Sequence, residues 1–361
     1  MNTLSDSLYK AFLLGWPQWQ NTGDPLATSQ FTIRLSNQLR DEATKLDLNP
    51  ATIIAQAGQA AKSGRPGAFS EFWKQLERSL IVLIYGSNFV EAAGSSLQIT
   101  TELCRDVFHG IPVTANVDER NPSYQQHLQA LTNTDREPNK ANVIQSRKEA
   151  ILHARALSFM INRIVLNNKP WSEELIFQAH AILYEGLDND VTPGQYRDHD
   201  VAVSYEKPGE KQKWSICMRA KAVPVCMRQL ITSLNNDIAS AEASGEIDPY
   251  TLSGKIHDYF LMIRPFGDGN GRMARIILNV LLLKYAGHVA HIGSDNDKGE
   301  YLDVVRGGQK ISGQEDMEVD ILRQKSHRET ARFILFKSKS NLEQMWSWAS
   351  RRARVSSCLP T

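Results

Sequence analysis

The stretch of this chain best suited to chemistry is IRPFGDGNGRMAR, residues 263–275, where glycines alternate with an acid and an amide. Gly269, Asn270 and Gly271 are residue types that adopt unusual backbone angles readily, so successive N–H groups can point toward one centre. A helix that begins within this stretch would add the positive end of its dipole. Together these features predict a nest of backbone amides that binds an anion.

Charged side chains flank the predicted nest. Arg272 and Arg275 are three positions apart, so on a helix they project from one face and can hold neighbouring phosphate groups. Asp268 precedes the nest, where a carboxylate can hold Mg²⁺ that bridges bound phosphates. The alternative is a glycine-rich corner between two helices with solvated charges. The complete set of residues favours a phosphate site over that corner.

Two other phosphate-binding motifs do not fit. A dinucleotide fingerprint needs a strand before a full G-x-G-x-x-G pattern, whereas here a helical pattern precedes glycines spaced G-x-G-x-G. A Walker loop needs Lys followed by Ser or Thr after its glycines, and this chain has Arg272-Met273.

Helices are expected on both sides of the glycine stretch. The first begins with Asp248 as its cap and Pro249 at its first position, and Pro265 ends it. The second begins inside the stretch and is closed by Gly287. Further helices are predicted over 70–92, 146–166, 172–186 (with Ser172 as the cap) and about 316–349.

One segment breaks the helical pattern. Residues 201–216 alternate apolar and polar side chains on both sides of a turn at Pro208-Gly209, which predicts a β-hairpin. The hairpin could simply decorate the helices, or its edge could accept another chain as an added strand. Spacing alone leaves both interpretations open.

Composition sets broad limits. The chain has 361 residues, enough for one large domain or two ordinary ones, and its 41 basic and 40 acidic residues give no global field that would attract nucleic acid. Four scattered cysteines indicate a reducing compartment. We find no signal peptide and no membrane-spanning run. A cytoplasmic protein is therefore expected; the basic SRRAR near the C-terminus keeps a nuclear address open, and the terminal Cys358-Leu359-Pro360-Thr361 fits prenylation only formally.

At this point the sequence resembles the Fic/DOC family, whose signature is H-x-F-x-[DE]-G-N-G-R-x-x-R. Every fixed position except the first is present, as Phe266, Asp268, Gly269, Asn270, Gly271, Arg272 and Arg275. The segment GQYR (194–197) before the hairpin looks like the family's flap region, and HDYFLMI (257–263) looks like the helix that leads into the motif. The resemblance covers about residues 145–310.

The resemblance implies an all-α Fic fold, a helical bundle with a small β-hairpin flap. Its domain layout would be an N-terminal helical region over 1–140, the Fic domain over 141–310 and a C-terminal helical extension over 311–361. The implied activity is transfer of AMP from Mg·ATP to a Ser, Thr or Tyr hydroxyl of a target protein, and some relatives also remove AMP. Partners would be ATP and the target protein, without nucleic acid or membrane, and a homodimer stays open.

Carried over by position, each motif residue has an expected role. Asp268 would hold the metal, and Phe266 would anchor the loop. The segment Gly269-Asn270-Gly271 would cradle the α- and β-phosphates, and Arg272 and Arg275 would hold the triphosphate. The target segment would dock on the flap along Val201, Ala202, Val203 and Ser204.

Position 264 departs from the family. Relatives carry a histidine there that takes the proton from the target hydroxyl, but Arg264 stays protonated and offers no acceptor. Loss of a general base typically lowers the rate by ~10²–10⁴. We therefore expect severe impairment of transfer with nucleotide binding retained. His257 lies about two helical turns earlier and should be too far away to substitute. Engineered loss and a natural pseudoenzyme both remain open as origins of Arg264.

The family's inhibitory motif, [ST]-x-x-x-E-[GN], has a partial match upstream. Ser87 and Glu91 lie on one helix face, within a candidate inhibitory helix over about 80–95, but Ala92 stands at the last position. The resemblance implies that Glu91 pairs with Arg275 and blocks productive nucleotide binding. The plainer interpretation is a polar residue at a helix end.

Two rival functions stay open: a catalytically inactive nucleotide-binding scaffold, and a relative that transfers another phosphate-containing group. The histidines of RDHD (197–200) and HVAH (288–291) lack the rest of a metal-ligand set, so neither segment is predicted to bind a metal.

Overall fold

The computed structural model describes residues 3–13, 32–62, 68–121, 124–132, 136–187, 191–205, 213–294, 296–318 and 327–357. The helices of the N-terminal half are α1 (Leu4–Leu13), α2 (Asn37–Lys45), α3 (Pro50–Lys62), α4 (Ala68–Val90), α5 (Leu97–Phe108), α6 (Tyr124–Thr132) and α7 (Lys140–Met160). The later helices are α8 (Glu173–Leu183), α9 (Val223–Ser244), α10 (Pro249–Ile263), α11 (Asn270–Ala286), α12 (Lys298–Glu318) and α13 (Arg328–Ser357). The predicted all-α fold class is confirmed.

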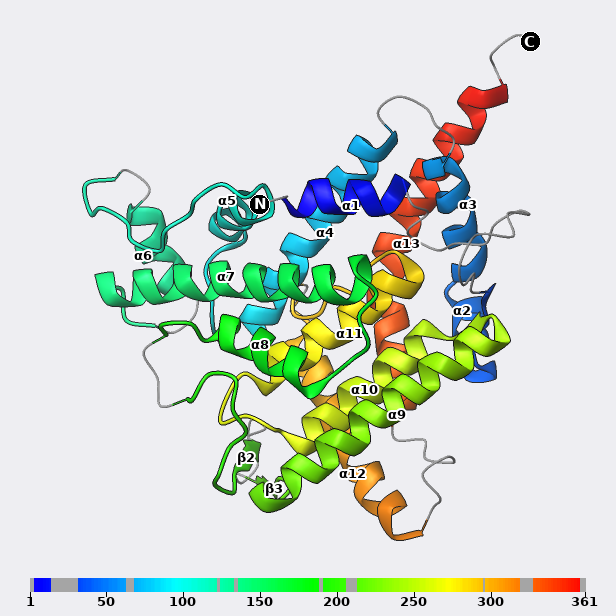
Figure 1. The fold of residues 1–361 in the computed structure, drawn as a ribbon. Coiled ribbons are helices and arrows are strands. Elements are labelled where there is room, and N and C mark those ends of the chain that lie inside the picture. The colour runs from blue at the N-terminus through cyan, green and yellow to red at the C-terminus, as the bar shows by residue number, and fades with distance from the viewer. Residues whose placement is uncertain are drawn as a thin grey trace.

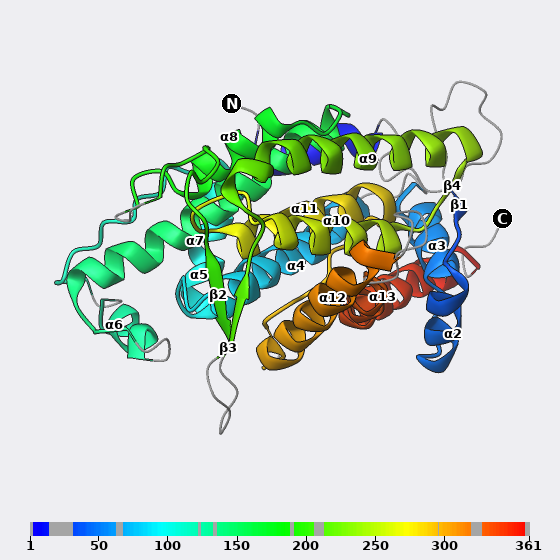
Figure 2. The ribbon, with the colours of Figure 1, turned by 90° about the horizontal axis from the view of Figure 1, so that it is seen from below.

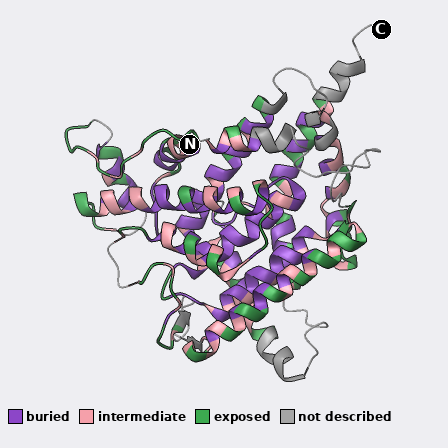
Figure 3. Cartoon of the chain, in the orientation of Figure 1, coloured by how far each residue is buried: buried purple, intermediate pink, exposed green. Residues whose placement is uncertain are grey.

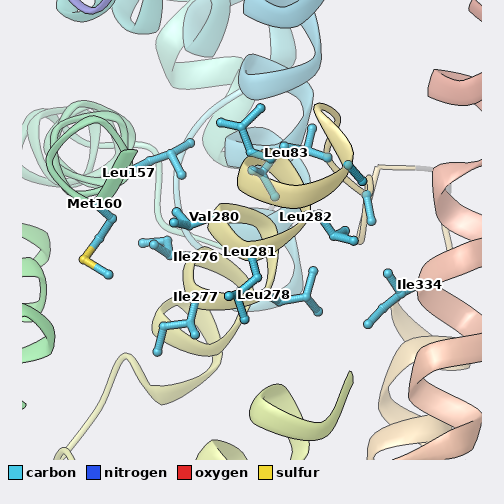
Figure 4. Packing of buried hydrophobic residues seen from close by; sticks show 14 of the residues in the cluster. Leu83, Leu157, Met160, Ile276, Ile277, Leu278, Val280, Leu281, Leu282 and Ile334 are labelled. Carbon is cyan, nitrogen blue, oxygen red and sulfur yellow. The ribbon is translucent and has the colours of Figure 1, made fainter. Parts of the chain in front are cut away.

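Helix α11 is the centre of the molecule, with α4, α7, α8, α10 and α13 arranged around it (Figure 1). Nearly every side chain of α11 is buried, and the buried residues concentrate at this centre (Figure 3). Leucines and isoleucines on successive turns of α11 meet Leu83 of α4, Leu157 and Met160 of α7, and Ile334 of α13 (Figure 4). A helix that is buried on all sides must be enclosed by others, and this enclosure holds the start of α11 in place.

The caps predicted from the sequence form as expected. Ser172 accepts a hydrogen bond from the Leu175 N–H at the start of α8. Asp248 caps α10 by accepting from the N–H groups of Tyr250 and Thr251. Because both caps fix where their helices begin, they also fix the direction in which α8 and α10 approach the glycine stretch.

Helix α4 is seated on the core through a glycine contact. A Cβ at Gly86 would lie 2.4 Å from the Ile292 carbonyl oxygen, and one at Gly293 would lie 2.2 Å from the Gly86 carbonyl oxygen. Backbone therefore touches backbone here, which places the C-terminal half of α4 directly against the segment that follows α11.

Strands are few in the described residues. The predicted hairpin forms from β2 (Ala202–Tyr205) and β3 (Lys213–Ile216), antiparallel, with Ala202 opposite Ile216, and it projects from the helical body (Figure 2). Its predicted turn at Pro208-Gly209 lies outside the described residues. A second, unpredicted pair is parallel: β1 (Thr32–Ile33) lies beside β4 (Glu246–Ile247).

The last helical segment differs from the prediction. A single region from about 316 was expected, but α12 runs over Lys298–Glu318 and α13 begins at Arg328. The periodicity of α12 is hard to recognise because glycines and charges interrupt its apolar face. Earlier in the chain, α7 continues into a π-helix over Ile161–Leu166. None of the helices in the described ranges combines the length and the apolar character that a bilayer crossing demands.

Candidate functional site

The glycine stretch is a tight loop between α10 and α11. Gly269 takes a left-handed φ of +75°, and a Cβ there would lie 2.4 Å from the Tyr184 ring, so only glycine fits. The Asn270 side chain closes the loop: its Oδ1 accepts from the Phe266 N–H at 3.0 Å, and its Nδ2 donates to the Phe266 carbonyl at 2.8 Å. The side chain of Asn270 thus shapes the loop, which leaves its backbone N–H as the group available to a phosphate.

Phe266 is fully buried beneath this loop. Its ring stacks on His180 of α8, with centroids 3.7 Å apart and planes 8° from parallel. His180 Nδ1 accepts from the Gly194 N–H at 2.9 Å, so its Nε2–H must donate to the Asp268 carbonyl at 3.1 Å. Burial lowers the pKa of His180 to about 4, which keeps the imidazole neutral as this arrangement requires.

Arg272 is buried with unused hydrogen-bonding capacity. It is 5% exposed, and its Nη2 donates to the Tyr184 hydroxyl at 2.5 Å while its Cζ lies 5.0 Å from the centroid of that ring. Its Nε and Nη1 have no hydrogen-bond partner among the residues that the structure describes. A buried guanidinium with two unpaired nitrogens is costly, so this geometry fits an anion that completes the set.

In contrast, all three nitrogens of the Arg275 guanidinium have hydrogen-bond partners. It is 1% exposed; Nε donates to Ser87 Oγ and Nη2 to the Ser87 carbonyl, both at 2.8 Å, and Nη2 also contacts Glu91 Oε1 at 2.6 Å. Nη1 donates to the Tyr301 hydroxyl at 3.2 Å. Burial opposes the charge of Arg275, but Tyr301 and Glu91 raise its pKa above the ordinary value.

The Glu91 carboxylate lies over the start of α11. A Cβ at Gly271 would lie 2.1 Å from Glu91 Oε1, so the missing side chain of Gly271 is the space that the carboxylate fills. A negative group therefore already sits at the positive end of the helix. The structure brings Ser87 and Glu91 of the candidate inhibitory helix to the second motif arginine.

The end of α4 carries backbone strain. The helix ends at Val90, and Ala92 takes a left-handed φ of +51°, a conformation that glycine or asparagine adopts at lower cost. The preceding turn is held firmly, because buried Asn88 pairs through Oδ1 with Nδ1 of His153 on α7 at 3.0 Å.

Arg264 stands between α10 and the hairpin. It also has a left-handed φ, +46°, and its Nε lacks a hydrogen-bond partner within the described ranges. Burial raises the pKa of the Cys217 thiol, while Arg264 and Arg197 act in the opposite direction, so both guanidinium groups act on the foot of the hairpin. The side chain of Arg264 carries no acceptor atom, as the sequence implied.

Arg197 fastens the hairpin to the end of α10. Its buried guanidinium donates to the carbonyls of Ile263 at 3.3 Å and Arg264 at 2.7 Å. On the hairpin side it donates to His199 at 2.8 Å and to Met218. One side chain thus ties both feet of the hairpin to the end of α10 and to position 264.

Asp268 remains accessible: its side chain is two-thirds exposed and lies 3.8 Å from Arg272 Nη2. An exposed carboxylate beside unpaired arginine N–H groups suits a hard cation bound together with phosphates. The described residues contain no group of three or more His, Cys, Asp or Glu side chains that could hold a metal alone.

Four residues of the site were not assigned this role from the sequence: His180, Tyr184, Arg197 and Tyr301. His180 and Tyr184 stand on successive turns of α8, and their rings stack with centroids 4.8 Å apart. A histidine and a tyrosine at i and i+4 on a buried helix face are a usable signal, although it also fits ordinary core packing.

Comparison with known proteins agrees with this geometry. The Fic/DOC family model matches residues 170–282, which include the whole loop. A Fido domain-containing protein of Dictyostelium discoideum is 32% identical over 117 residues, covering 32% of this chain and 71% of that protein. The chain belongs to the Fic/DOC family.

Other Fic/DOC relatives match at greater distance. A probable protein adenylyltransferase of Aquifex aeolicus is 30% identical over 113 residues, a segment that spans 31% of this chain and 30% of that protein. Among solved structures, a Fic domain containing signaling protein from Bacteroides thetaiotaomicron matches with a TM-score of 0.60 and 18% identity, over 82% of this chain and 97% of that one. Fic-1 from C. elegans matches with a TM-score of 0.52 and 14% identity, over 84% of this chain and 73% of that one. The shared fold therefore extends beyond residues 170–282 to most of the chain.

Proposed function

We propose that this Fic/DOC protein binds Mg·ATP at the start of α11 and has the architecture of a protein adenylyltransferase, restrained by Glu91 and severely impaired by Arg264. The observation that carries the proposal is Arg272, which is buried beside the glycine loop with two nitrogens, Nε and Nη1, that lack a hydrogen-bond partner among the described residues. The relative from Aquifex aeolicus named a probable protein adenylyltransferase supports this choice of reaction.

The residues around the loop divide the work of nucleotide binding. The backbone amides from Gly269 to Gly271 and the unpaired N–H groups of Arg272 would receive phosphate oxygens. Arg275 would hold the far end of the triphosphate once Glu91 leaves it. Asp268 would hold Mg²⁺, which when bound neutralises phosphate charge and polarises the phosphoryl group.

The transfer step explains why position 264 decides activity. The oxygen of a target hydroxyl forms a bond to the α-phosphorus, the bond from that phosphorus to the bridging oxygen breaks, and pyrophosphate leaves. The hydroxyl proton must pass to an acceptor during this step. Arg264 cannot accept it, so nucleotide binding persists while transfer is slow.

The hairpin is suited to presenting the target hydroxyl. Within the described strands, neither β2 nor β3 has a neighbour beyond the other, so a target segment can add along Val201, Ala202, Val203 and Ser204. Because Arg197 ties both feet of the hairpin to Ile263 and Arg264, a docked segment would keep a fixed distance from the loop.

A second candidate is a nucleotide-binding scaffold without transfer activity. Arg264 itself favours it, since the remaining loop residues are present and only the proton acceptor is lost. Transfer of another phosphate-containing group remains the third alternative.

Reversion of the base position separates these functions. We would prepare R264H and R264Q, each combined with E91A, and incubate them with Mg·ATP labelled at the α- or the γ-phosphate. We expect α-label on protein for R264H, at least ~10²-fold more than for R264Q, which removes the positive charge without adding a base. Label from the γ-position alone would indicate phosphate transfer. No label in either case, with Mg·ATP binding intact, would refute the adenylyltransferase proposal in favour of the scaffold.

A further inference from the structure

A buried network of hydrogen-bonded side chains lies behind Arg275 and has no part in the mechanism above. The Tyr301 hydroxyl of α12 contacts His257 Nε2 at 2.9 Å, and His257 Nδ1 contacts Asp258 Oδ1 at 2.9 Å. Thr330 at the start of α13 donates from Oγ1 to Oδ1 and Oδ2 of Asp258, at 2.9 and 2.8 Å. At the other end of this network, Arg275 Nη1 donates to the Tyr301 hydroxyl.

With a neutral imidazole at His257, the donors and acceptors fit in one direction. Arg275 can only donate, so the Tyr301 oxygen accepts from it and the Tyr301 hydrogen is free to donate to His257 Nε2. His257 then carries its proton on Nδ1 and donates it to Asp258. Burial raises the pKa of Tyr301, which keeps this phenol protonated. Arg275 is thus joined to Asp258 through Tyr301 and His257.

Every side chain of this network is nearly or fully buried. Buried polar networks cost desolvation free energy, and apolar side chains would fill the same space at lower cost. What a fully satisfied network provides in return is a fixed geometry. The Tyr301 ring adds to this, because the Arg275 Cζ lies 5.4 Å from its centroid.

We propose that Tyr301, held by His257 and Asp258, is a positioning residue that keeps Arg275 aimed at the nest after Glu91 leaves. Tyr301 holds Nη1, so loss of the Glu91 contact frees one edge of the guanidinium without freeing its plane. The group that replaces Glu91 Oε1 beside Arg275 is the terminal phosphate of a nucleoside triphosphate. This inference rests on the proposed function for the identity of the ligand. It adds that three helices outside the loop set the preference for triphosphate over diphosphate.

The network also extends to α13. Thr330 is the outermost member and connects the C-terminal helical extension to Arg275 through Asp258, His257 and Tyr301. A change at Thr330 should therefore alter nucleotide binding, although this residue lies three hydrogen-bonded side chains away from Arg275.

The test measures the Kd values of Mg·ATP and Mg·ADP by calorimetry in the E91A background, which removes the competing carboxylate. Adding Y301F should weaken Mg·ATP binding about tenfold, the size expected for one hydrogen bond to a charged group, and leave Mg·ADP within about twofold. T330V keeps the side-chain shape and should act in the same direction by about threefold. It carries the test if Y301F does not fold.

The matched control is Y250F. Tyr250 is also a buried tyrosine whose hydroxyl contacts a histidine, His288 Nε2, at 2.9 Å, but the structure gives its hydroxyl no arginine contact. Y250F should lower the unfolding temperature about as much as Y301F and leave the ratio of the two Kd values unchanged. In an R275A/E91A background, Y301F should change Mg·ATP binding less than twofold, because its effect passes through Arg275.

The outcomes are distinguishable. No measurable Mg·ATP binding by E91A would overturn the proposed function and this inference with it. Binding by E91A that Y301F and T330V leave unchanged would overturn the inference alone. Equal weakening of Mg·ATP and Mg·ADP by Y301F would show a purely structural role and would also overturn it.

Discussion

Removal of the Glu91 carboxylate should tighten nucleotide binding. The carboxylate contacts Arg275 Nη2 at 2.6 Å and fills the space over Gly271 where a phosphate would lie. A nucleotide must displace it before Arg275 can act. In E91A the nest is open from the start, while Ser87 and Tyr301 still hold Arg275.

The size of the effect follows from the contact that is lost. Arg275 is 1% exposed, but the Glu91 side chain is 35% exposed, so this ion pair is only partly shielded from water. A hydrogen bond between charged groups contributes about 1.5–3 kcal/mol. Since ATP no longer has to break it, the Kd of Mg·ATP should fall about ten- to a hundredfold. The unfolding free energy should fall by only about 1–2 kcal/mol, because three other contacts keep Arg275 satisfied.

Calorimetric titration with Mg·ATP, beside urea unfolding of each variant, checks both values. E246A is a matched control, since Glu246 pairs with Arg34 at the same 2.6 Å but at the surface, between side chains 43% and 65% exposed. E246A should leave Mg·ATP affinity unchanged and cost less than about 1 kcal/mol. If E91A bound Mg·ATP no more tightly than the parent chain while remaining folded, the inhibitory role of Glu91 would be refuted.

Two further predictions concern stability. Ala92 has a φ of +51°, so A92G should raise the unfolding free energy by about 0.5–1 kcal/mol in urea titrations. A93G, at a neighbour without positive φ, should lower the unfolding free energy. A lower unfolding free energy for A92G would contradict the strain at this helix end. Burial lowers the pKa of His180 and His288 from 6.5 to about 4, so between these values the unfolded chain binds more protons and stability falls as pH falls. Urea unfolding should show a loss of about 2 kcal/mol per histidine between pH 7 and pH 5, and H180Q should remove one such contribution; an unchanged pH dependence in H180Q would show that His180 titrates normally.

Much of the fold was accessible from local patterns. Ser172 and Asp248 predicted the starts of α8 and α10 because a cap needs only its own turn of helix. The alternation over 201–216 predicted the hairpin for the same local reason. The parallel pairing of Thr32 with Glu246 was not predictable, because its partners are more than two hundred residues apart and each strand has two residues. The start of α12 was missed because glycines and charges interrupt its apolar period.

The candidate site, like the fold, could be predicted from the sequence only in part. Residue types and spacing from Phe266 to Arg275 already indicated a phosphate nest, and the chemistry of a guanidinium already showed that Arg264 cannot accept a proton. Those conclusions follow from the sequence alone, because backbone freedom and charge are properties of the residues themselves.

The tertiary structure alone decided which side chains meet Arg275. Ser87 and Glu91 come from α4, Tyr301 from α12, and His257 from α10, and they converge because tertiary packing brings these three helices to Arg275 of α11. From the sequence, His257 was only a histidine too far from Arg264 to replace a base. In the fold it contacts Tyr301 and through it reaches Arg275, because helix packing sets distances that separation along the chain does not encode.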